Sequence, residues 1–172
     1  TGFTRLAEPY EGYLFPDTYE VKVDVTAEEL IELMRQTFDK KTAGLRLTPE
    51  TVILASIVER ESIGDEDRSQ IAGVYANRIR QGIRLEADPT IQYAKGNWAA
   101  VTLAEYKSVI SPYNTYLNDG WPPGPICSPG LKSLTAAATP ASHDYLYFFH
   151  AKGQTYFSKT YAEHAAKVRQ FF

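Results

Sequence analysis

The 172-residue sequence contains little of what metal and thiol chemistry require. It has one cysteine, Cys127, and three histidines, His143, His150 and His164. A lone cysteine excludes an internal disulfide and says little about compartment. No CxxC or HExxH motif is present, and the histidines lack the spacing of metal ligands. We therefore expect no metal site or other cofactor, and we interpret each histidine as a surface or capping residue.

Other signatures are missing as well. No Gly-rich loop precedes a helix in the phosphate-binding pattern, no GxSxG elbow occurs, and Cys127 has no obvious histidine partner, which argues against acyl transfer. A net charge of −3 gives no electrostatic reason to expect nucleic acid. No apolar run approaches the ~20 residues that span a bilayer, and no signal peptide is recognisable. Because the chain begins at Thr1, we interpret it as a domain of a longer protein.

Apolar and aromatic residues are plentiful. Hydrophobic residues make up 44% of the chain, which is enough to bury the core of one domain. Aromatic residues reach 13%, with 12 tyrosines. Such rings serve as platforms in sugar-binding clefts, and they also serve in ordinary cores, so composition leaves both uses open.

The stretch from Thr48 to Gly64, TPETVILASIVERESIG, predicts the central helix. Thr48 is a suitable N-cap, Pro49 suits the first turn, and Gly64 suits the end. At about 100° per residue, this helix has one apolar face, formed by Ile53, Leu54, Ile57 and Val58.

Glu61 falls on the centreline of this apolar face, whereas Glu59 points the opposite way. A carboxyl that faces the core loses solvation, which raises its pKa and lets it carry a proton near neutral pH, as a general acid must. The helix alone leaves another interpretation open, because a glutamate in a last turn can emerge into water.

The remaining patterns predict a helix-rich α+β single domain with a small antiparallel sheet. Residues 1–8 show no periodicity, and 8–21 are interpreted as an extended strand or loop. The first predicted helix covers 26–40, and its core-facing residues are Leu30, Ile31, Leu33, Met34 and Phe38. Further helices are predicted over 68–81, from 88, from 102 to before Pro112, and from Ser128 to Pro140, the last with Leu131, Leu134 and Ala138 facing inward. A hairpin over 145–158, which turns at 152–153, and a last helix from Thr160 to Phe172 complete the predicted elements. The stretch 111–130 is rich in proline and glycine and is longer than most loops that only connect two elements. Ordered loops of this length are often functional.

Several motifs together resemble the YceG-like family of endolytic murein transglycosylases. The matching stretches are EGYLFPDTYEV at 11–21, LASIVERES at 54–62, VYANRIRQGIRLEADPTIQYA at 74–94, SPYNTY at 111–116, PPGPICSPGLKSLTAAATPA at 122–141 and YLYFF at 145–149. They cover nearly the whole chain in the family's order. The sequence departs from the family pattern at Glu86-Ala87 and at Trp121.

The resemblance implies a lysozyme-like catalytic cleft in which Glu61 is the catalytic acid. Protonated Glu61 would donate to the glycosidic oxygen between N-acetylmuramic acid and N-acetylglucosamine. The carboxylate would then take the proton of the muramyl 6-hydroxyl, which closes onto C1 to give a 1,6-anhydro end. Because water is not the acceptor, no second carboxylate is needed to activate it.

Polar residues of the matching motifs are our candidates for the substrate groove. These candidates are Asp88, Thr90, Gln92, Asn114 and Tyr116, together with Glu11, while Gly124, Pro125 and Ile126 would shape the cleft wall through backbone rigidity. Local roles stay open for three of them: Asp88 as a helix N-cap, Asn114 in an Asx-turn and Tyr116 in the core.

Two alternatives to the transglycosylase remain. A lysozyme-like hydrolase would need a second carboxylate facing Glu61, from Glu11, Asp17 or Asp88. A non-catalytic glycan-binding module would need no carboxyl. The resemblance also implies peptidoglycan strands as substrate, peptidoglycan synthases or division proteins as partners, and a place at the extracytoplasmic face of the bacterial membrane. The membrane anchor and LysM-like region that precede the family's catalytic domain would lie outside residues 1–172.

Overall fold

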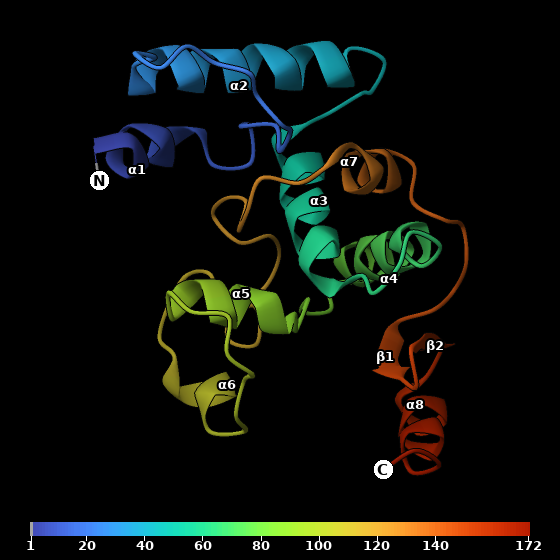
Figure 1. Cartoon of the computed structure of the whole chain (residues 1–172). Coiled ribbons are helices and arrows are strands. Elements are labelled where there is room, and N and C mark those ends of the chain that lie inside the picture. The colour runs from blue at the N-terminus through green and yellow to red at the C-terminus, as the bar shows by residue number, and fades with distance from the viewer. Residues whose placement is uncertain (1) are drawn as a thin grey trace.

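Helix α3 stands at the centre of the molecule, and the other elements are arranged around it (Figure 1). The structure is a computed structural model that describes residues 2–172. The helices are α1 (Gly2–Ala7), a 3₁₀ turn (Glu8–Tyr10), α2 (Ala27–Thr42), α3 (Pro49–Glu61), α4 (Arg68–Arg80), α5 (Asp88–Ala94), α6 (Glu105–Ser108), α7 (Leu131–Ala138) and α8 (Tyr161–Val168), and the strands are β1 (Tyr147–Ala151) and β2 (Gln154–Ser158). The predicted α+β architecture, rich in helix with a small antiparallel sheet, is confirmed. Among the described residues, no helix is both long and apolar enough to cross a membrane.

The start of α3 is set by its cap. Thr48 accepts a hydrogen bond from the Thr51 main-chain N–H, and the Thr51 side chain binds the Thr48 N–H in return. All residues from Val52 to Val58 are buried, because α3 packs against α4 and α7 and forms the middle of the core. The helix ends at Glu61 with Ser62 in an extended conformation, so Gly64 is not its cap.

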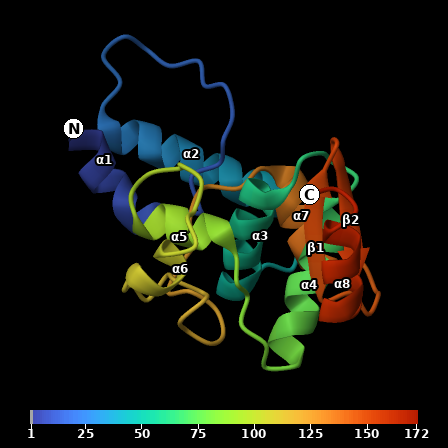
Figure 2. The same ribbon diagram turned by 90° about the horizontal axis from the view of Figure 1, so that it is seen from below.

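Two lobes extend from this core. The α5–α6 lobe (residues 88–120) lies on one side, and the hairpin lobe (residues 145–172), made of β1, β2 and α8, lies on the other (Figure 1). Helices α1 and α2 cover the opposite end of α3. Seen from below, the segment before α2 swings out from the body as a long loop (Figure 2). The two lobes therefore face each other across the C-terminal end of α3.

The hairpin follows its predicted pattern. Lys152 and Gly153 both have positive φ, 49° and 73°, as a tight two-residue turn between antiparallel strands requires. The register pairs His150 with Thr155 and Phe148 with Phe157.

Some sequence predictions were wrong. Residues 2–7 form α1, which lacks the apolar period that would reveal it. Leu33 and Leu131 are exposed, although we expected both to face the core. Helix α7 begins at Leu131 and not at Ser128-Pro129, because its N-cap residue, Gly130, still has an extended backbone conformation. The last helix ends at Val168.

Two Thr–Glu pairs with the spacing of a capping box, Thr102 with Glu105 and Thr160 with Glu163, form it only in part. The Glu105 carboxylate accepts hydrogen bonds from the Thr102 N–H and hydroxyl, yet α6 begins at Glu105 itself. Thr160 caps α8 by accepting from the Glu163 N–H, but the Glu163 carboxylate binds the Lys159 N–H instead of closing the box.

We predict that Gly12→Ala destabilises the domain by about 2 kcal/mol. Gly12 has a φ of +87°, and a Cβ there would lie 2.4 Å from Pro125 Cγ. Urea unfolding measures the change. Gly44→Ala is the matched control, because its Cβ would meet nothing within 4 Å. Equal stability of the two variants would contradict the predicted contact between Gly12 and Pro125.

Candidate active site

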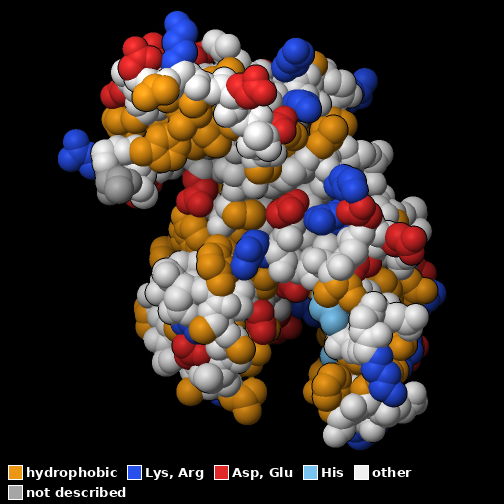
Figure 3. Space-filling model, in the orientation of Figure 1, with side chains coloured by type: hydrophobic (Ala, Val, Ile, Leu, Met, Phe, Trp, Pro, Cys, Tyr) orange, Lys and Arg blue, Asp and Glu red, His pale blue; other side chains and the backbone are white. Residues whose placement is uncertain are grey.

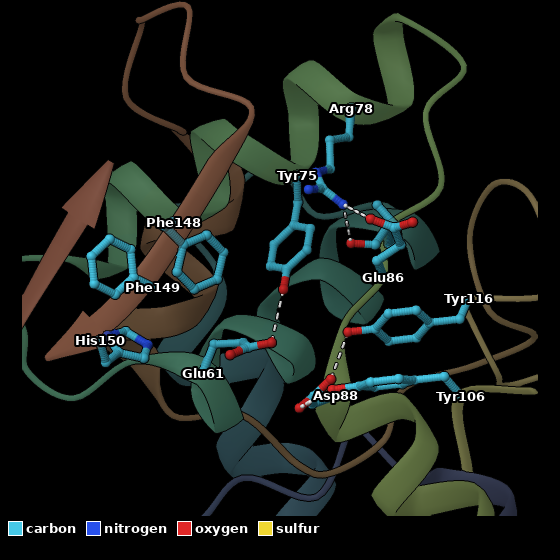
Figure 4. Close-up of a pocket in the computed structure, with 11 residues that line it drawn as sticks. Glu61, Tyr75, Arg78, Glu86, Asp88, Tyr106, Tyr116, Phe148, Phe149 and His150 are labelled. Carbon is cyan, nitrogen blue, oxygen red and sulfur yellow. Dashed lines mark hydrogen bonds and ion pairs between the residues drawn. The ribbon is translucent and has the colours of Figure 1, made fainter. Parts of the chain in front are cut away.

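Glu61 is the last residue of α3, at the point where the helix leaves the core. Its side chain is partly buried and reaches into a cavity of about 240 Å³. Three regions of the chain line the cavity (Figure 4). The first is the end of α3 together with α4 and the irregular segment that follows α4, the second is the α5–α6 lobe, and the third is β1 of the hairpin lobe. The lining residues are Glu61, Tyr75, Arg78, Leu85, Glu86, Asp88, Tyr106, Tyr116, Phe148, Phe149 and His150. On the surface, the cavity belongs to the cleft between the two lobes, where acidic side chains and histidine gather (Figure 3).

The surroundings of Glu61 favour its protonated form. Burial is the largest effect and raises the pKa of Glu61 to about 7. The Tyr75 hydroxyl donates a hydrogen bond of 2.8 Å to Glu61 Oε1 and acts in the opposite direction. The Asp88 charge raises this pKa further, and Arg78 lowers it. The sum is a carboxyl that can both hold and release a proton near neutral pH.

Asp88 is fixed in place by two stacked tyrosines. Tyr116 donates a hydrogen bond of 2.6 Å to Asp88 Oδ1, and Tyr106 donates one of 3.4 Å to Oδ2. The two rings stack with centroids 4.2 Å apart. Burial, followed by the bond to Asp88, raises the pKa of Tyr116, so its hydroxyl remains a donor. Asp88 therefore presents an oriented carboxyl to the cavity, and its alternative role as an N-cap is not observed.

Arg78 connects the parts that surround the cavity. Its guanidinium donates to the carbonyl groups of Leu85 (2.9 Å) and Leu146 (2.7 Å) and pairs with Glu86 at 3.1 Å. Arg78 is 7% exposed. It thereby ties α4 to the segment that leads into α5 and to the chain that enters β1, which holds both lobes at fixed positions around Glu61.

The hairpin lobe supplies an aromatic wall to the cavity. Phe148, Phe149 and His150 line it from β1 (Figure 4). Our interpretation of His150 as a surface or capping residue was therefore wrong, because the strand turns its ring toward Glu61. His143 likewise bonds inside the fold, to the Gln70 carbonyl and the Tyr145 N–H.

Of the predicted groove residues, Asp88 and Tyr116 line the cavity with Glu61, whereas Thr90 and Asn114 are buried with 0% exposure. Thr90 bonds Thr115 and anchors α5 to the following loop. Asn114 accepts from the Tyr116 N–H in an Asx-turn and donates to two carbonyl groups of the α6 region. Both side chains thus position Tyr116 and Asp88, and no surface is left on them for a sugar.

The other predicted groove residues lie away from the cavity. Gln92 donates to the carbonyl groups of Trp98 and Ala99 and holds that loop. Ile126 is 1% exposed and its N–H binds Ser56, while Gly124 and Pro125 pack beside it against Tyr113 and Gly12. Glu11 accepts a hydrogen bond of 2.5 Å from Tyr93 and lines a separate hollow beside α1.

Sequence reasoning missed several cavity residues, chiefly Tyr75, Arg78, Tyr106 and the β1 residues. Tyr75 belongs to the buried core at 2% exposure, and nothing in the sequence marked its hydroxyl as a group of the cavity. Arg78 also lies on the inner face of α4. An arginine at a core-facing position of a helix is the one sequence signal that could have indicated a buried group holding neighbouring segments together.

Comparison with known proteins identifies the family of this chain. The profile of the YceG-like family matches residues 1–170. The chain belongs to the YceG-like family. It is 36% identical over 170 residues to an endolytic murein transglycosylase of Bacillus subtilis, covering 93% of this chain and 47% of that protein. It is 35% identical over 176 residues to one of Streptococcus pneumoniae, covering 93% and 32%.

A solved structure shares the fold of this YceG-like chain. A putative yceG-like protein of Listeria monocytogenes superposes with a TM-score of 0.87 at 40% identity, covering 92% of this chain and 55% of that chain. The chain thus spans about half or less of the curated relatives it matches, and about half of the solved one.

We predict that Glu61→Gln changes the pH dependence of stability. The folded carboxyl keeps its proton up to about pH 7, whereas the unfolded one releases it from about pH 4.5. The unfolded state binds fewer protons in that window, so wild-type stability falls as pH rises through it, by roughly 3 kcal/mol from this group. Glutamine mimics the protonated acid and does not titrate. The free energy of unfolding of the variant therefore rises relative to that of the wild type between pH 4 and pH 8. Urea unfolding at both pH values measures this, and a pH-independent difference would contradict the raised pKa.

Proposed function

We propose that this domain acts as an endolytic murein transglycosylase on peptidoglycan glycan strands. The observation that carries the proposal is the Glu61 carboxyl, whose pKa is about 7 and which reaches into a cavity between two lobes. Two YceG-like relatives bear this activity in their names.

Glu61 performs the first step as an acid. A carboxyl with a pKa of about 7 is protonated in about half of the molecules at neutral pH. It donates this proton to the oxygen of the bond between N-acetylmuramic acid and N-acetylglucosamine. The bond from C1 to that oxygen breaks, and positive charge develops on the muramyl ring.

Glu61 performs the second step as a base. The carboxylate left by the first step takes the proton of the muramyl 6-hydroxyl, whose oxygen forms the new bond to C1. Glu61 is protonated again, and the product ends in 1,6-anhydro-N-acetylmuramic acid. Tyr75 supports the carboxylate between the steps, because its hydroxyl donates to Glu61 Oε1.

Asp88 and the aromatic residues assist by charge and shape. The Asp88 carboxyl, held by Tyr116 and Tyr106, places negative charge beside the cavity, where it stabilises the positive charge of the ring. The phenylalanines of β1 and the stacked tyrosines provide flat apolar faces on opposite sides of the cavity for sugar rings.

We place the protein at the outer face of the bacterial membrane, where murein and its synthases are found.

A lysozyme-like hydrolase is the second candidate. The presence of Asp88 in the Glu61 cavity favours it, because hydrolysis uses a second carboxylate. Glu11 does not line this cavity, and Asp17 is paired with Lys41 on the surface.

We predict that Glu61→Gln lowers the rate of strand cleavage at least about 100-fold, because the amide cannot transfer the proton. Purified glycan strands and chromatographic quantification of fragments provide the assay. Glu59→Gln is the matched control, since Glu59 lies outside the cavity and binds Arg68, Ser133 and the Gly130 N–H. That variant loses stability but keeps cleavage. Equal loss of activity in both would refute the role of Glu61.

The products separate the two candidates. We predict fragments whose muramyl ends lack one water, as mass spectrometry detects, because the acceptor is the sugar's own hydroxyl. Reducing ends that contain the water would identify a hydrolase and make Asp88 its second carboxylate. Binding of strands without any cleavage would point to a glycan-binding module.

A further inference from the structure

Arg60 is a cation without a carboxylate partner, next to Glu61. It directly precedes Glu61 in the last turn of α3, so the two Cα atoms lie about 3.8 Å apart. Its side chain is exposed, and within residues 2–172 no carboxylate pairs with it. The guanidinium lies instead over the ring of Trp98, 3.8 Å from the centroid. We call these two side chains the Arg60–Trp98 pair.

The acids near Arg60 have other partners. Burial raises the pKa of the single cysteine, and the charges of Glu59, Arg60 and Glu11 affect it as well, so these three groups lie near one another. Glu59 is bound by side chains of α4 and α7. Glu11 accepts the hydroxyl proton of Tyr93. Neither acid is an ion-pair partner of Arg60, so its guanidinium can pair with an anion from outside the chain.

The ring beneath Arg60 is held in place by α5. Trp98 lies in the loop that follows α5 and is 44% exposed. The Gln92 side chain of α5 donates to the carbonyl groups of Trp98 and Ala99, at 3.3 and 3.1 Å. Helix α5 also packs against α3 and carries Asp88 into the cavity. The Arg60–Trp98 pair therefore joins α3 to the α5–α6 lobe in a fixed arrangement.

This arrangement suits a carboxylate. A guanidinium stacked on an indole keeps its N–H donors, because they point outward in its own plane. Those donors form a planar fork that matches the two oxygens of a carboxylate. The indole also removes water from one face of the cation, which strengthens its attraction for an anion. The pair is therefore a preformed site for a carboxylate.

The Arg60–Trp98 pair lies outside the cavity but adjoins it. Neither residue lines the cavity. The charges of Asp88 and Arg78 act on the pKa of Glu61, whereas that of Arg60 does not. Arg60 thus has no part in tuning the acid, and a ligand group that reaches it must extend from the cavity along the α5–α6 lobe.

We propose that the Arg60–Trp98 pair binds a carboxylate of the peptide stem on the muramyl residue at Glu61, and so favours strands whose stems are charged. This rests on the proposed function, which puts a muramyl residue in the cavity. With the stem attached, the sugars are neutral, because the lactyl carboxyl of muramic acid forms the amide bond to the peptide. The carboxylates of such a strand therefore lie on its stems, where a cation beside the cavity can recognise them.

Binding tests this site without turnover, in proteins that carry Glu61→Gln. The probes are soluble glycan strands with peptide stems, and the same strands after carbodiimide coupling to methylamine, which converts their carboxylates to neutral amides. We expect added Arg60→Gln to raise the Kd of the charged strands about fivefold and to leave the Kd of the amidated strands unchanged, as isothermal titration calorimetry measures. This difference should shrink as salt is added.

Arg46→Gln, also combined with Glu61→Gln, is the matched control. It removes the same charge from the exposed loop before α3, which the 13-residue helix separates from Arg60 by about 20 Å. We expect this protein to bind both kinds of strand as Glu61→Gln alone does. An equal loss in the two arginine variants, or an equal loss on amidated strands in Arg60→Gln, overturns the proposal.

Trp98→Ala tests the ring of the pair. It keeps the charge of Arg60 and removes the surface that orients it. We expect about a twofold weaker binding of charged strands only, with no further loss when the change is added to Arg60→Gln. An equal loss on amidated strands would show that the ring binds sugar directly, and would overturn the role proposed for the pair.

Cleavage distinguishes this proposal from the proposed function. In protein that retains Glu61, we expect Arg60→Gln to raise KM for charged strands more than it lowers kcat. Equal cleavage of charged and amidated strands by the wild type overturns the stem site and leaves the proposed function standing. Arg60-dependent binding without cleavage by the wild type supports the stem site and refutes the proposed function. Absence of both binding and cleavage overturns both.

Discussion

The Glu61 carboxyl is removed from bulk water because the helix that carries it is buried on every side from Val52 to Val58. The fully buried part of the helix ends at Val58, and the last turn carries Glu61 from the core to the cavity between the two lobes, where its side chain is still partly buried. Loss of solvation then shifts the proton equilibrium of the carboxyl toward neutral pH. The packing of α3 against α4 and α7 therefore both stabilises the core and raises the pKa of Glu61.

Fixed lobes keep this environment constant. Arg78 joins α4 to both sides of the cavity, and Asn77 binds the carbonyl groups of His143 and Tyr145 ahead of β1. On the other side, Asn114 and the Thr90–Thr115 pair fix the loop that presents Tyr116. These buried polar groups are satisfied, so they specify one arrangement of the cleft.

Helical periodicity was enough to place Glu61 on the inner face of α3 and to give most helices and the hairpin, since these depend on local patterns. The surroundings of Glu61 depend on contacts between distant segments, which one sequence does not reveal. Thus the hydrogen bond from Tyr75 to Glu61 was not predicted. His150 was interpreted as a surface or capping residue, and Asn114 as a groove residue with the Asx-turn as an open alternative. Exposure of Leu33 and Leu131 shows the same limit: the pattern indicates which residues are apolar, and not which partner covers them.

Direct titration of the Glu61 carboxyl tests this account most closely. ¹³C NMR of protein labelled at glutamate side chains follows the resonance, and its absence in Glu61→Gln assigns it. Desolvation at the end of α3 predicts a midpoint of about 7. A midpoint near 4.5, the usual value for glutamate, would mean that water reaches the carboxyl freely and that Glu61 is not poised to act as an acid.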